Sequence, residues 1–159
     1  MARYHANTEL VRDVAALDRR SKTWFVLRCI EYLPESAPCR AEVMAALRDF
    51  ASGEGRLNKS EVDGILYRLA DDHTSLGVRG SIDIDEHNAL CALDDAMLCA
   101  YGLDNSLDRN PLTYALSCHD YVVAILNKNN GKQFKAEMKL YLKELKQVDQ
   151  ILEKLISGG

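Results

Sequence analysis

The chain has 159 residues, of which 47% are hydrophobic and 28% charged, a composition typical of one globular domain with a sizeable core. Its net charge of −4 argues against a protein that coats nucleic acid, and no uncharged stretch approaches the roughly 20 residues of a membrane-spanning helix. Because the start of the chain lacks the apolar run of a signal peptide, we expect a single cytoplasmic domain over residues 1–159 with no membrane partner.

Apolar residues recur along most of the chain at the spacing of an α-helix, and only three prolines and nine glycines interrupt them. This pattern predicts an all-α fold, a compact bundle of about seven helices. The expected helices cover approximately residues 8–20, 22–33, 38–50, 58–72, 86–101, 111–126 and 132–156.

Several helix ends carry local signals. Asn58 is a good N-cap, and Glu61 follows three residues later, where its side chain can reach back to the Asn58 backbone. Pro38 suits the first turn of the third helix, and Asn110 is a good cap for the sixth. Gly102 can adopt the left-handed conformation that ends many helices, so we expect the fifth helix to stop there.

One stretch departs from the helical period. Val78, Ile82 and Ile84 alternate with polar residues on either side of Gly80, a pattern typical of two short strands and a turn. We therefore predict one short β-hairpin at residues 76–85.

Three predicted helices followed by this hairpin give residues 22–85 the outline of a winged helix, with helix 58–72 in the recognition position. A dimeric winged-helix transcriptional regulator is thus the alternative function for the chain. Asp63, Asp71 and Asp72 on the same helix oppose this interpretation, because they would meet phosphate oxygens. The candidate DNA contacts are Lys59, Ser60, Tyr67, Arg68 and Arg79.

The expected C-terminal helix, 132–156, has an apolar seam at alternating steps of four and three residues, the heptad pattern. Leu142, Ile151 and Ile156 widen the apolar stripe beyond what one partner helix would cover. The stripe is expected either to close the core of its own bundle or to be shared between that bundle and a second copy in a homodimer, and the seam alone does not separate the two. The seam consists of Phe134, Met138, Tyr141, Leu145, Val148, Leu152 and Leu155.

Charge is unevenly distributed along the chain. Residues 85–127 hold one basic and seven acidic groups, whereas residues 128–159 hold seven lysines and four acidic groups. Repeated lysines three, four and seven residues apart oppose the helix slightly, which favours compensation by an acidic surface of the protein itself or of a partner. The expected partner-binding residues are Lys132, Lys135, Lys139, Lys143, Lys146, Asp94, Asp95, Asp104 and Asp108.

His87 and Cys91 lie four residues apart, on one face of the fifth helix, and Cys118 and His119 could approach them from the sixth. A zinc site is one interpretation of these four residues, while a core histidine and ordinary buried cysteines are the other. The sequence contains no phosphate loop or nucleophile elbow, so we expect a non-enzymatic protein without catalytic residues, resident metal or cofactor.

We therefore expect a regulatory, adaptor or inhibitor protein that acts by binding another macromolecule. A protein is the favoured partner, nucleic acid is the alternative, and a homodimer through residues 132–156 is compatible with both.

Overall fold

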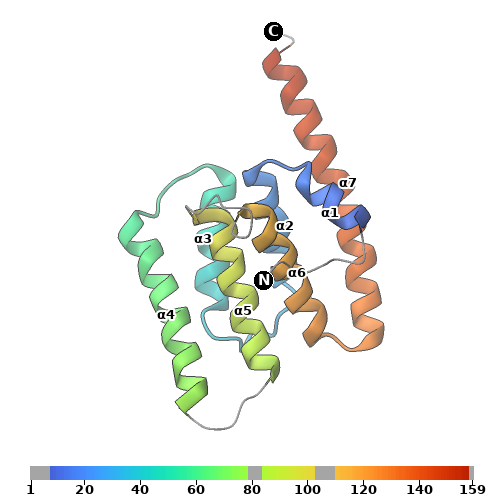
Figure 1. Ribbon diagram of the computed structural model, residues 1–159. Coiled ribbons are helices and arrows are strands. Elements are labelled where there is room, and N and C mark those ends of the chain that lie inside the picture. The colour runs from blue at the N-terminus through green and yellow to red at the C-terminus, as the bar shows by residue number, and fades with distance from the viewer. Residues whose placement is uncertain (1–7, 79–83, 103–109, 158–159) are drawn as a thin grey trace.

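A computed structural model describes residues 8–78, 84–102 and 110–157, and within these ranges the chain forms seven α-helices and no strand (Figure 1). The predicted all-helical class is confirmed. The helices are α1 (Thr8–Ala15), α2 (Arg19–Ile30), α3 (Arg40–Ser52), α4 (Lys59–Val78), α5 (Ile84–Tyr101), α6 (Pro111–Ile125) and α7 (Lys128–Ser157).

The predicted β-hairpin at 76–85 is wrong. Residues 76–78 are the last residues of α4, and α5 already begins at Ile84; residues 79–83, including the proposed wing-tip Arg79, lie outside the described residues. The helical period in fact continues past the expected break near His73, because Leu76 follows Leu69 by seven residues and both are buried. The winged-helix interpretation of 22–85 depended on that hairpin, and the described residues supply no wing.

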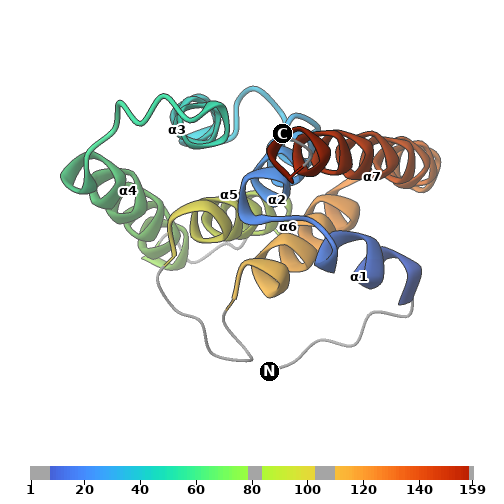
Figure 2. The same cartoon turned by 90° about the horizontal axis from the view of Figure 1, so that it is seen from above.

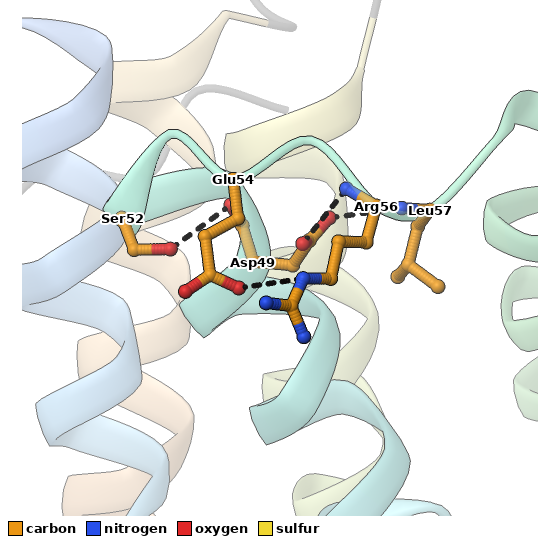
Figure 3. A network of polar contacts seen from close by, with 5 residues as sticks. All are labelled: Asp49, Ser52, Glu54, Arg56 and Leu57. Carbon is orange, nitrogen blue, oxygen red and sulfur yellow. Dashed lines mark hydrogen bonds and ion pairs between the residues drawn. The ribbon is translucent and has the colours of Figure 1, made fainter.

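The start of α4 follows the predicted capping box. The Glu61 backbone N–H donates to Asn58 Oδ1 over 2.8 Å, and the Asn58 N–H donates to Glu61 Oε1 over 3.3 Å. In the connection from α3, the Asp49 carboxylate accepts hydrogen bonds from the backbone N–H groups of Arg56 at 2.9 Å and Leu57 at 3.0 Å (Figure 3). These contacts hold the chain in place as it enters α4.

Other helix ends differ from the predicted ones. Asp18 caps α2 by accepting a 2.8 Å hydrogen bond from the Ser21 N–H, so the first predicted helix is split, with α1 ending at Ala15. α3 begins at Arg40, preceded by Cys39 in the left-handed region at φ 65°. Gly102 does end α5, but its backbone is not left-handed.

Helix α5 occupies the middle of the bundle, with α2, α3, α4 and α6 packed around it (Figure 2). This position explains why its apolar residues point to several sides and why α5 lacks a clean polar face. The largest fully buried side chains of the core are Phe25, Phe134, Ile30, Leu47, Leu69, Leu90, Leu93, Met97, Met138 and Leu142.

Helix α7 has two parts with different surroundings. Its first part packs on the bundle, where the Phe134 ring meets Tyr32 edge-on at a centroid distance of 4.8 Å and Arg28 lies 4.6 Å from the Tyr141 ring. The contact with α2 reaches Asp149, whose Oδ1 accepts a 2.6 Å hydrogen bond from the Ser21 hydroxyl. The C-terminal end then extends beyond the other helices (Figure 1). Core packing therefore accounts for only part of the predicted seam.

Candidate functional site

The exposed part of the α7 seam is the largest departure from an ordinary core helix. Val148 is 51% exposed and Leu155 70%, although both continue the seam that is buried at Phe134, Met138 and Leu145, and Ile151, which widens the apolar stripe, is 57% exposed. Ile156, beside the seam, is also exposed. A contiguous apolar strip of this kind on a protein surface marks an interaction site more often than single exposed residues do. We call Val148, Ile151, Leu155 and Ile156 the tail strip.

Six of the seven lysines of α7 are exposed and Lys146 is half-buried, and together they do not form one uniform surface. Lys139 Nζ lies 3.6 Å from Glu9 Oε1, and Lys146 Nζ lies 3.6 Å from Asp13 Oδ1. Both of these acidic partners lie on α1 rather than in the part of the acidic region 85–127 that the structure describes. The remaining three lysines of the predicted stripe are exposed and form no ion pair with another described residue: Lys132, Lys135 and Lys143.

The predicted acidic surface is not an open one where the structure describes it. Asp94 and Asp95 are both partly buried on α5, and burial raises the pKa of each carboxyl group, that of Asp95 to about 7. Asp95 Oδ2 is buried without a hydrogen-bond partner. Asp104 and Asp108 lie outside the described residues. Two carboxyl groups held in this way are poorly suited to meet a large basic partner.

The proposed DNA contacts on α4 are exposed but partly neutralised. Lys59 Nζ forms an ion pair with Asp63 Oδ2 at 2.8 Å, and the Arg68 guanidinium forms one with the Glu42 carboxylate. Tyr67 is 74% exposed, and Ser60 is also exposed. Arg79 lies outside the described residues, so the expected set of five DNA contacts is not brought together by the part of the chain that is described.

The four candidate zinc ligands divide into two separate places. His119 is buried in the core, where its ring stacks near Phe25 at 6.1 Å and lies 5.1 Å from the Phe134 ring. Cys118 is buried as well. Cys118 and His119 are therefore better interpreted as core residues. His87 and Cys91 remain as candidate metal ligands on α5.

His87 and Cys91 instead meet a residue that the sequence analysis missed. His73 comes from α4, and the ligand atoms of His73, His87 and Cys91 all lie within 4.8 Å of one another. The fourth helix was expected to cover residues 58–72, so His73 was not expected on it. With α4 read as continuous to Val78, His73 lies on the part of the helix that packs on α5.

Comparison with known proteins places the chain in no group: no protein-family model matches it, and no curated protein or solved structure is significantly similar to it. None of the described helices combines the length and apolar character needed to cross a membrane.

Proposed function

We propose that this protein is a non-enzymatic adaptor, regulator or inhibitor that binds a partner protein through the C-terminal part of α7. The observation that carries this proposal is the tail strip, an apolar seam that stays exposed on a helix extending beyond its own bundle. Val148, Ile151 and Leu155 are spaced i, i+3 and i+7. This spacing is how an amphipathic helix places anchors into the apolar groove of a partner.

The charge of α7 indicates what surrounds such a groove. The helix carries seven lysines and four acidic residues, a net charge of +3 that comes from residues 128–142, because residues 143–157 hold three charges of each sign. Lys143 is exposed five residues before Val148, where the helix approaches the tail strip. A partner with an apolar groove and an acidic group facing Lys143 fits this part of the helix, because complementary charges at the edge of an interface speed association and fix orientation.

The experiment compares two changes on the same helix. An Ile151→Asp/Leu155→Asp double variant places charge in the tail strip, whereas Leu140→Asp places it at a residue that is 61% exposed on α7 but outside the seam. Tagged proteins are used to capture partners from lysate of the native cell, with and without nuclease treatment. We expect the wild-type protein and Leu140→Asp to capture the same partner and the double variant to lose it.

A second arm tests the charge of Lys143. Lys143→Glu should weaken capture, and the loss should be greatest at low salt, where charge attraction is least screened. Lys139 is left unchanged, because its reversal would also repel Glu9 within the protein.

Three outcomes would contradict the proposal. Capture that survives in the double variant would remove the tail strip as the binding surface. Capture that disappears with nuclease in the wild type would favour the alternative, DNA or RNA binding. A dimer in light scattering that the double variant dissociates would identify a second copy of the chain as the occupant of the strip.

A further inference from the structure

Two helices bring together three side chains of the kinds that bind transition metals. His73 lies on α4, and His87 and Cys91 lie one turn apart on α5. The His87 Nε2 and Cys91 Sγ atoms are 3.5 Å apart, and the rings of His73 and His87 meet edge-on with centroids 5.5 Å apart. His73 and Cys91 are partly buried, while His87 is exposed, so an ion could reach the cluster from solvent.

We propose that His73, His87 and Cys91 form a binding site for a divalent transition-metal ion, with Zn²⁺ as the best match. Imidazole nitrogen and cysteine sulfur are the ligands that zinc takes in proteins. For bonds of about 2.1 Å to nitrogen and 2.3 Å to sulfur, a tetrahedral ion separates the two ligand atoms by about 3.6 Å. The His87–Cys91 distance of 3.5 Å already meets this requirement, and the nearest ring nitrogen of His73 lies within 4.8 Å of both other ligand atoms.

The surroundings of the cluster favour a cation. Asp94 lies one turn beyond Cys91, close enough to His73 for the histidine to oppose the rise in the pKa of the Asp94 carboxyl group that burial causes. A doubly charged ion at the cluster would lie near this partly buried carboxyl group, and the negative charge of an ionised carboxylate favours a cation there.

The site has three protein ligands, which leaves the fourth position of a tetrahedral ion for water. Binding requires the Cys91 thiol to lose its proton to solvent, so each bound ion releases one proton from the cysteine and affinity should rise with pH. Because the ligands come from both α4 and α5, a bound ion would connect these two helices directly.

The probe is Co²⁺, which occupies zinc sites and absorbs light when bound to a thiolate. The full chain, freed of metal with a chelator, is titrated with Co²⁺ and then with Zn²⁺ as competitor. We expect one Co²⁺ per chain, a near-ultraviolet thiolate-to-cobalt absorption band together with the visible bands of a tetrahedral ion, and displacement by one equivalent of Zn²⁺. Binding should also raise the melting temperature, because the ion binds only the folded protein.

Single variants assign the ligands. His73→Ala and His87→Ala should each weaken Co²⁺ binding at least tenfold, and Cys91→Ser should remove the thiolate band. Cys39→Ser is the matched control, because Cys39 is also partly buried but bonds to Asp72 outside the cluster, and this variant should bind as the wild type does. His87 is exposed, so His87→Ala tests the site even if another variant fails to fold.

The absence of stoichiometric binding at a tenfold excess of Co²⁺ and Zn²⁺ would overturn the proposal. So would binding that His87→Ala leaves unchanged, or a thiolate band that persists in Cys91→Ser and disappears in Cys39→Ser.

Discussion

The division of α7 into a packed part and an exposed part can be tested with one substitution made at two places. Leu142 and Leu155 are leucines of the same helix, but Leu142 is 1% exposed and Leu155 is 70% exposed. Replacing Leu142 with alanine removes buried methyl and methylene groups and leaves a cavity, which lowers the free energy of unfolding by about 2–5 kcal/mol.

The same substitution at Leu155 removes far less buried apolar surface. Burying a whole leucine side chain contributes about 1.5–3 kcal/mol, and roughly a third of that, about 0.5–1 kcal/mol, is the most that a residue 70% exposed can contribute. Alanine also has a slightly higher helix propensity than leucine, by a few tenths of a kcal/mol, which opposes the loss. We therefore expect Leu155→Ala to lower the free energy of unfolding by less than about 0.5 kcal/mol.

The assay is urea unfolding followed by circular dichroism at low micromolar and at tenfold higher protein concentration. For a single chain with an exposed tail, Leu142→Ala is strongly destabilised at both concentrations and Leu155→Ala at neither. Equal destabilisation by the two variants at the lower concentration would refute the reasoning, because it would mean that Leu155 packs within its own bundle. A loss in Leu155→Ala that appears only at the higher concentration would indicate self-association through the tail strip.

Three further predictions concern the bundle itself. Asp49→Ala removes the acceptor for the N–H groups of Arg56 and Leu57 and should lower the free energy of unfolding by about 1–2 kcal/mol in urea unfolding, whereas Asp49→Asn should recover part of this loss. Asn110→Ala removes the cap of α6 and should cost about 1 kcal/mol in the same assay, with Asn110→Asp close to the wild type; an unchanged midpoint would show that the cap contributes nothing. Lys22 is buried, and this burial lowers the pKa of its ammonium group below 10.5. Near that pH, Lys22 therefore keeps its proton in the unfolded chain but has lost it in the folded protein. Relative to Lys22→Met, the wild type should therefore gain stability as pH rises toward 10.5 in thermal melts, and a difference that stays constant with pH would contradict the shift.

The parts of the fold that were predictable are those decided by residues close together in the chain. The Asn58–Glu61 capping box and the Asn110 cap each involve residues three positions apart, so their sequence signals are complete in themselves. The heptad seam of α7 was equally visible, because its spacing alone defines a helix face.

The errors arose where a local pattern had two meanings. Val78, Ile82 and Ile84 alternate like strand residues, but Leu69 and Leu76 on the same stretch also satisfy the helical period, and burial of both in the bundle decided the outcome for α4. Asp18 was read as the interior of one long helix, although aspartate is also a strong N-cap, and its side chain starts α2.

The candidate sites depended on information that the sequence does not carry. The meeting of His73 with His87 and Cys91 follows from the packing of α4 on α5, and no spacing within the chain indicates it. The separation of His119 from that cluster depends likewise on where α6 meets α2 and α7, against Phe25 and Phe134. The seam of α7 could be found, but the residue at which the bundle stops covering it could not.

Because α7 is one continuous helix over Lys128–Ser157, it also acts as a rigid spacer between the bundle and its own C-terminal end. Thirty helical residues span about 45 Å, and the turn from one residue to the next is about 100°. A partner bound to the C-terminal end of α7 is therefore held at a fixed distance and angle from the bundle. Inserting a single alanine after Asp149 would rotate Ile151, Leu155 and Ile156 by about that angle relative to Val148 and the bundle, so the tail strip would be divided and a partner could no longer contact all four residues at once.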